Sequence, residues 1–231
     1  MIARLLEPEV MDTSEDAHDY DTMDHSTVNR VFVEDFLGFS QANGFDARLA
    51  DQRQPLRVLD VGTGTALIPI ELCSRRVACQ IIAIDLAAEM LKLADLNIVK
   101  ANLASVIQTE RVDAKQLPYS TGAFDAVISN SIVHHIPEPL AVFAEMARVL
   151  QPGGLLFIRD LLRPESVADV DQFVATYAGR ENSHSQQLFR DSLLAALTLD
   201  EVRDIAVAHG IPATSVAQTS DRHWTLSWLS G

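Results

Sequence analysis

The stretch VLDVGTGTA at residues 58–66 joins a short apolar run to a turn that contains two glycines. The apolar residues predict a buried strand, and the sequence TALIPIELCSRRV at residues 65–77 predicts the helix that follows it. Gly62 and Gly64 allow close approach of a ligand to the backbone because no Cβ stands in the way. A glycine turn between a strand and a helix is typical of nucleotide-binding sites in α/β proteins.

Strand-like and helix-like segments alternate along the rest of the chain. The predicted strands are residues 57–62, 80–85, 105–114, 124–131, 154–162, 214–220 and 223–229. The predicted helices are residues 26–41, 65–77, 87–102, 139–150, 165–179, 185–197 and 199–210. Such alternation predicts an α/β fold in which a doubly wound, mainly parallel sheet is covered on both faces, and the last two strands predict a hairpin.

Acidic residues lie at the ends of the first three predicted strands. Asp60 precedes the glycine turn, where it would repel a pyrophosphate but attract an ammonium or sulfonium group. Asp85 lies 23 residues after Gly62 (85 − 62), which is the spacing of an acid that binds ribose hydroxyls. Asp113 ends the third strand, where its carboxylate can accept hydrogen bonds from the amino group of adenine. These positions predict a ligand with a nucleoside at one end and a cationic amino acid at the other.

With these motifs the chain resembles the class I S-adenosylmethionine-dependent methyltransferases, and most closely their small-molecule branch, which includes quinone and cyclopropane fatty acid methylating enzymes. The resemblance covers about residues 56–160 and departs from the common pattern at Ala66, which replaces a third glycine. It implies a Rossmann-like sheet of seven strands with an antiparallel C-terminal strand, and S-adenosylmethionine as cofactor. The cofactor-binding residues that it implies are Asp60, Gly62, Thr63, Gly64, Asp85, Leu86, Met90, Asp113, Ala114 and Asn130.

The resemblance also implies an N-terminal lid, which we place at residues 1–45, ahead of a methyltransferase domain at residues 46–231. Tyr20 is the aromatic residue of this lid that we expect to reach the cofactor, where its ring face would attract the sulfonium. An anchor for the lid at the surface is the alternative role of Tyr20. We expect a helical cap at about residues 163–198, with substrate-binding candidates Arg180, Asn182 and His184.

Three residues at the expected ligand edge are candidates for catalysis. His134 and His135 follow the fourth strand, and one of them could act as a general base if the acceptor is protonated. Arg159 ends the fifth strand and could bind an acceptor carboxylate, or it could neutralise the adjacent Asp160. His25 and His223 are weaker candidates.

Composition narrows the class of partner. The formal net charge of −14 disfavours nucleic acid as a substrate. No apolar stretch is long enough to span a membrane, so we expect a cytoplasmic protein, as a monomer or homodimer. Cys73 and Cys79 lack the spacing of a zinc site, and we expect no metal.

The leading prediction is an enzyme that transfers a methyl group in line to a small-molecule acceptor. Lyase or cyclase chemistry on the same cofactor is an alternative, because a fold does not dictate its chemistry. A non-catalytic regulatory module that retains the cofactor site is another. An NAD-dependent oxidoreductase is disfavoured by Asp60.

Overall fold

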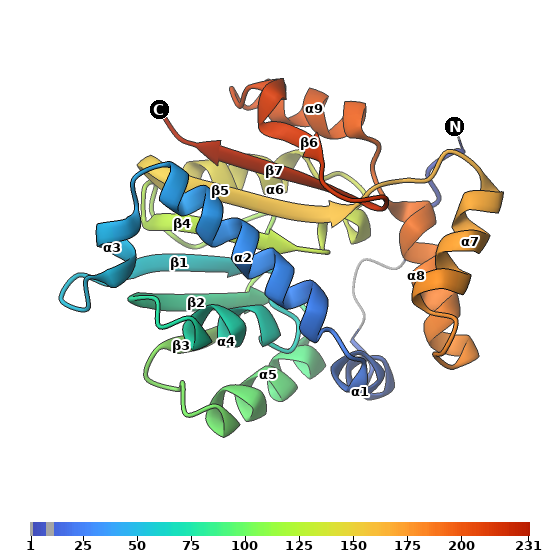
Figure 1. Cartoon of the computed structure of the whole chain (residues 1–231), viewed down its shortest axis with the longest axis horizontal. Helices are drawn as coiled ribbons and strands as arrows, with labels where there is room; N and C mark the ends of the chain where they lie inside the picture. Colours follow the sequence, from blue (N-terminus) through green and yellow to red (C-terminus); the bar gives the residue numbers. More distant parts are fainter. Residues whose placement is uncertain (1, 8–11) are drawn as a thin grey trace.

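The computed structural model describes residues 2–7 and 12–231, which form one mixed sheet covered by helices on both faces (Figure 1). The strands are β1 (Leu56–Val61), β2 (Cys79–Asp85), β3 (Ile107–Arg111), β4 (Phe124–Asn130), β5 (Leu150–Leu161), β6 (Val216–Gln218) and β7 (His223–Leu229). The helices are α1 (Ser14–Thr22), α2 (Ser26–Ala42), α3 (Asp46–Ala50), α4 (Leu67–Ser74), α5 (Ala88–Lys100), α6 (Leu140–Val149), α7 (Val167–Tyr177), α8 (Ser183–Ala195) and α9 (Leu199–Ala208), with short 3-10 helices η1 (Val133–His135) and η2 (Ala213–Ser215).

The strand order is β3-β2-β1-β4-β5-β7-β6, which confirms the predicted doubly wound sheet of seven strands. The pairs from β3 to β5 are all parallel, whereas β7 is antiparallel to both of its neighbours. The first strand, β1, lies in the middle of the sheet, and the later strands are added outward on either side of it. The order therefore reverses between β1 and β4, and open α/β sheets bind ligands at such a point.

Side chains alternate between two cores along the central strands, as the pleat of a strand requires. On β1, Leu59 and Val61 pack with α6 and α9, whereas Leu56 and Val58 pack with α2 and α4. Asp60 belongs to the second face, and its backbone is fixed by parallel pairing with β2 and β4. The carboxylate of Asp60 is therefore held beside the turn that follows β1.

The N-terminal segment contains the main departure from the sequence prediction. The first predicted helix begins at residue 26, since no helical or strand period is clear before it, but α1 forms there and lies beyond the carboxyl ends of the parallel strands (Figure 1). Ala17 and Tyr20 pack against Ala87 and Met90 at the start of α5. Residues 1 and 8–11 of the predicted lid lie outside the described residues.

Two smaller departures concern turns. Residues 150–153, which precede the predicted strand at 154–162, are part of β5, and the pairing of β4 with β5 shifts register between Phe124 and Ala126. The polar stretch after residue 45 forms the short helix α3. Among the described residues, no helix combines the length and the apolar character needed to cross a bilayer.

Candidate functional site

Two adjoining pockets open at the carboxyl ends of β1, β2 and β4, and Tyr20, Gly62 and Asn130 line both of them. The larger pocket is lined mainly by the ends of β2, β3 and β4 and the residues that follow them. The predicted residues in its lining are Tyr20, Gly62, Gly64, Asp85, Leu86, Met90, Asp113, Ala114, Asn130 and His135. The smaller pocket contains the other two predicted cofactor residues, Asp60 and Thr63, together with Asn29 and Thr65.

The turn after β1 is shaped by its glycines. Gly62 and Gly64 adopt left-handed φ values of +73° and +55°, which favour glycine. A Cβ on Gly62 would lie 2.6 Å from side-chain atoms of Ile132, so the turn and the segment after β4 pack without room for a methyl group. Ala66, which stands where the common pattern has a third glycine, also adopts a left-handed φ, of 62°. The sequence did not predict this conformation for an alanine.

Asp60 is a buried carboxylate without compensation. Its side chain lies in the smaller pocket, and its Oδ2 atom has no hydrogen-bond donor among the described residues. Burial raises the pKa of Asp60 to about 7, an effect that the nearby Thr63 side chain opposes and the charge of Asp85 reinforces. A buried carboxylate of this kind is stabilised by a positively charged group. The Oγ1 atoms of Thr63 and Thr65 are likewise buried without a partner in the described structure, and the set fits the charged end of an amino acid.

Asp85 lies at the end of β2 and is tied to two turns. Its Oδ2 accepts a hydrogen bond of 2.8 Å from the N–H of Gly64, and its Oδ1 accepts one of 2.9 Å from the N–H of Ala87. Burial raises its pKa, and these backbone hydrogen bonds oppose that effect. Each oxygen has a further lone pair, so the oriented carboxylate can still accept hydroxyl donors from the pocket.

Asp113 lies on the opposite side of the larger pocket and is more exposed. Its Oδ1 accepts a hydrogen bond of 2.9 Å from the N–H of Lys115 and lies 3.1 Å from the Nζ of the same residue. Between Asp85 and Asp113 the pocket is lined by Leu86, Met90 and Ala114. A flat apolar ring system fits between polar ends of this kind.

Tyr20 covers the turn from the outside. Its ring stacks on His25 at a centroid distance of 4.4 Å, and its Cε1 lies 3.6 Å from the position that a Cβ on Gly64 would take. Burial and the nearby charges of Asp85 and Asp60 raise the pKa of Tyr20 to about 12. The side chain is therefore a neutral phenol that lies beside both carboxylates.

The three catalytic candidates have different surroundings. His135 lines the larger pocket, whereas His134 is buried and its Nδ1 lies 2.5 Å from Asp160 Oδ1. Arg159 lines neither of the two pockets described above. Its Nη2 donates to Asp35 on α2 at 2.6 Å, and its Nε donates to Thr225 on β7 at 2.9 Å.

The suggestion that Arg159 and Asp160 neutralise each other is wrong. Adjacent residues of a strand point to opposite faces of the sheet. Arg159 accordingly pairs with Asp35 on the face covered by α2, while Asp160 pairs with His134 on the other side.

Two of the remaining candidates make hydrogen bonds that stabilise local structure. Asn182 caps α8 by accepting a hydrogen bond from the N–H of Ser185, and the Nδ1 of His223 bonds to Ser220 Oγ. Arg180 precedes α8 and His184 lies in its first turn, and neither residue lines either pocket. Ser131 and Ile132 also line the larger pocket, and they were not predicted because both lie in a loop without a recognisable pattern.

Comparisons with known proteins agree with this geometry. Residues 59–158 match the family model described as "Methyltransferase domain". The chain is 33% identical over 147 residues to a ubiquinone biosynthesis O-methyltransferase from Xanthomonas oryzae, an alignment that covers 61% of this chain and 59% of the relative. The chain thus spans less than two thirds of the length of that relative.

Solved structures show the same fold at low sequence identity. The plantazolicin methyltransferase BamL, solved with a desmethyl-plantazolicin analogue and SAH, superposes with a TM-score of 0.66 at 20% identity, covering 84% of this chain and 67% of BamL. A protein from Methanococcus maripaludis, described as a putative S-adenosyl-L-methionine-dependent methyltransferase, gives a TM-score of 0.64 at 17% identity and covers 98% of both chains.

Proposed function

We propose that this chain is a class I S-adenosylmethionine-dependent methyltransferase that binds S-adenosylmethionine across the two adjoining pockets and transfers the methyl group to a small-molecule acceptor. The observation that carries the proposal is the uncompensated carboxylate of Asp60 beside the glycine turn. A pyrophosphate would be repelled there, whereas the ammonium group of the methionine part would be attracted.

In this proposal different residues of the chain bind different parts of the cofactor. Asp60 binds the ammonium group, and Asp85 binds the ribose hydroxyls. Leu86, Met90 and Ala114 enclose the adenine, and Asp113 accepts hydrogen bonds from its amino group. Tyr20 covers the turn and shields the region near the sulfur from water.

When bound, the cofactor supplies an electrophilic methyl group. The protein's part is to align the acceptor and exclude water, since most of the barrier reduction in such a displacement comes from orientation. His135 is the candidate that lines the pocket, so we assign it, rather than Arg159, to contact with the acceptor. His134 is a positioning residue, because it is buried between His135 and Asp160.

We propose an acceptor hydroxyl, because the curated relatives are named O-methyltransferases. The acidic surface supports a small molecule over nucleic acid as the acceptor. A lid that includes α1, a cap at residues 163–198 and a cytoplasmic monomer or homodimer stay predictions from the sequence. In this proposal the lid is held by contacts of α1 with α5, which include Asn97 Nδ2 to Asp21 Oδ1 at 2.8 Å and Ser14 Oγ to Glu89 Oε2 at 3.0 Å.

The test is a transfer assay with S-adenosylmethionine labelled in its methyl group and a panel of hydroxylated aromatic and aliphatic small molecules. The proposal predicts label in at least one acceptor and stoichiometric release of S-adenosylhomocysteine. Asp85→Ala should abolish both, and Asp200→Asn, a change at a side chain that is 85% exposed, should not alter either. Labelled protein or nucleic acid, with no labelled small molecule, would contradict the proposal.

A further inference from the structure

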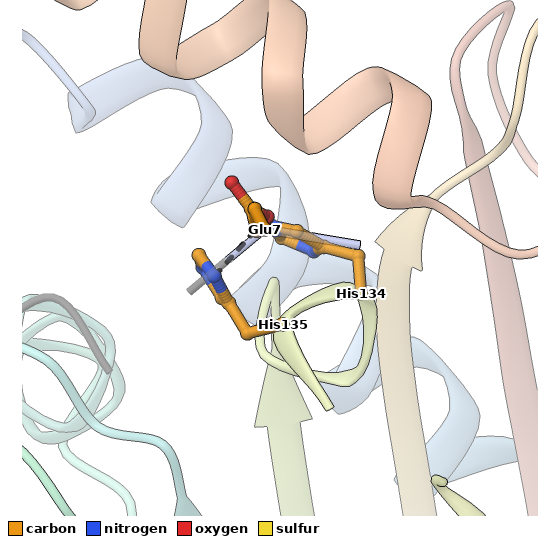
Figure 2. A group of neighbouring side chains, drawn as sticks. All are labelled: Glu7, His134 and His135. Carbon is orange, nitrogen blue, oxygen red and sulfur yellow. Dashed lines mark ion pairs between the residues drawn. The ribbon is translucent and has the colours of Figure 1, made fainter. Parts of the chain in front are cut away.

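A cluster of polar side chains lies at the edge of the larger pocket, and the proposed function gives no role to one of its members, Glu7. Glu7 from the N-terminal segment points toward His134 and His135 of η1 (Figure 2). Glu7 Oε1 lies 3.6 Å from His134 Nε2 and 3.1 Å from His135 Nδ1. One ligand atom from each residue lies within 4.8 Å of the others.

Two polar atoms of this cluster, Glu7 Oε1 and His135 Nδ1, have no hydrogen-bond partner among the described residues. Asp160 accepts from the backbone N–H groups of Val133 and Leu161, so its carboxylate is an acceptor that leaves the hydrogen on His134 Nδ1. In the neutral ring the lone pair then lies on His134 Nε2, on the side of Glu7. The Oε1 of Glu7 has no hydrogen-bond donor among the described residues, although its side chain is only 7% exposed. Glu7 Oε1 and His135 Nδ1 thus face each other at 3.1 Å without a hydrogen bond, and a shared cation would satisfy both atoms.

The N-terminal segment is held in place independently of the cluster. Arg4 donates to the carbonyl oxygens of His134, Ile136 and Ala195 at 3.1, 2.9 and 2.7 Å. The N–H of Leu5 donates to the carbonyl of Leu194 at 3.0 Å. These bonds, with a hydrogen bond of 3.3 Å from Ser192 Oγ to Glu7 Oε2, place Glu7 over η1 and leave its Oε1 available to a ligand.

We propose that Glu7, His134 and His135 bind a divalent transition-metal ion of the zinc type. Zinc binds nitrogen and carboxylate oxygen at about 2.0–2.2 Å in tetrahedral geometry, which places neighbouring ligand atoms about 3.4 Å apart. The separations of 3.1 and 3.6 Å bracket that value. Asp160 supplies the outer carboxylate that metal-binding histidines commonly contact through their other ring nitrogen.

The proposal revises the expectation of no metal. That expectation rested on the cysteines, and Glu7 is separated from the histidines by 127 residues (134 − 7), so no sequence spacing pointed to this set. Three protein ligands leave a coordination position for water or for an oxygen atom of a ligand. Since His135 also lines the larger pocket, that oxygen could belong to the methyl acceptor. This last consequence rests on the proposed function, whereas metal binding itself does not.

The test is a titration of tag-free, chelator-treated protein with Co²⁺, followed by its visible absorption and by competition with Zn²⁺. Wild type should bind one ion in a histidine-containing site. Glu7→Gln and His135→Gln should each weaken binding by at least about 10- to 100-fold, the effect of losing even an outer partner. Thermal unfolding without metal checks that both variants are folded.

Two controls separate this site from others. His18→Gln removes an exposed histidine of α1, and Cys73→Ser with Cys79→Ser removes thiols that lie 3.9 Å apart; both should leave the affinity unchanged. Absence of Co²⁺ binding to wild type would overturn the proposal. So would an affinity for Co²⁺ in Glu7→Gln and His135→Gln that equals that of wild type. S-adenosylhomocysteine binding, measured on the same metal-free preparations, reports separately on the proposed function.

Discussion

Asp85 at the end of β2 accepts a 2.8 Å hydrogen bond from the N–H of Gly64 in the turn after β1. The bond joins two neighbouring strands at their carboxyl ends and orients one carboxylate oxygen. The other oxygen is oriented by Ala87 at the start of α5. The acid at the ribose position is therefore fixed before any ligand arrives, and its orientation costs no further ordering on binding.

Asp85→Asn should weaken the binding of S-adenosylhomocysteine by about 10- to 100-fold, because hydrogen bonds to a charged group contribute about 1.5–3 kcal/mol. The measurement is the rise in melting temperature that a saturating ligand produces. We expect a much smaller rise in Asp85→Asn and an unchanged rise in the control Asp200→Asn. A full rise in Asp85→Asn would show that this carboxylate does not contact the ligand.

Gly62→Ala should destabilise the protein in two ways. A left-handed φ costs a residue with a Cβ about 1–2 kcal/mol, and the new methyl group would overlap Ile132, at 2.6 Å. Ile132→Ala should recover only the second part, because it makes room without relieving the backbone. Chemical unfolding of both single variants and the double variant measures the coupling, and strict additivity would contradict the predicted contact.

The binding of the cofactor should depend on pH through Asp60. Burial raises the pKa of this carboxyl to about 7 without ligand, so much of it is protonated at about pH 6. An ammonium group favours the carboxylate, so binding at that pH should release protons, and affinity should rise from about pH 6 to about pH 8. Calorimetry in buffers with different ionisation enthalpies measures the released protons, and Asp60→Asn should remove most of this release.

The contribution of Asp60 to folding stability should change with pH in the direction opposite to the change in ligand affinity. An unfolded Asp loses its proton near pH 4, whereas the folded Asp60 keeps its proton to about pH 7. The folded state therefore holds more protons in this window, and the contribution of Asp60 to the free energy of unfolding should fall as the pH rises from about 4 to 7. A difference between wild type and Asp60→Asn that does not change with pH would contradict the assigned pKa.

Arg159 should behave as a structural residue. Its guanidinium is buried, pairs with Asp35 and lies 5.8 and 5.7 Å from the ring centroids of Phe32 and Phe157. Asp35→Asn should lower the free energy of unfolding by about 1–3 kcal/mol, because it weakens the partner of a buried charge. The affinity of the folded variant for S-adenosylhomocysteine should not change. A loss of affinity without a loss of stability relative to wild type would indicate that Arg159 contributes to ligand binding.

Residues that follow periodic elements were predictable from the sequence. The strand ends at 60, 85 and 113 were placed by hydrophobic period and by the rule that parallel strands end at one edge, and all three acids line the adjoining pockets. The helix at residues 26–41 was predicted within one residue of α2. In these segments local pattern and tertiary packing favour the same structure.

Three features could not be predicted because they depend on contacts between distant residues. Helix α1 has almost no apolar period, and it packs on α5 through Ala17 and Tyr20 alone among its apolar side chains. The partner of Arg159 lies 124 residues away on α2, which sequence neighbourhood could not indicate. Glu7 meets the histidines of η1 because hydrogen bonds of Arg4 and Leu5 to distant parts of the chain hold the N-terminal segment there.

The central claim is that Asp60 and Asp85, on adjoining strands, hold the amino acid part and the ribose of one nucleoside-amino acid ligand. Isothermal titration of S-adenosylhomocysteine tests it most directly. We predict one ligand per chain, an affinity at least about 10-fold weaker in both Asp60→Asn and Asp85→Asn, and no change in Asp200→Asn. Failure of the wild-type protein to bind the ligand, or equal affinity in all four proteins, would contradict the account.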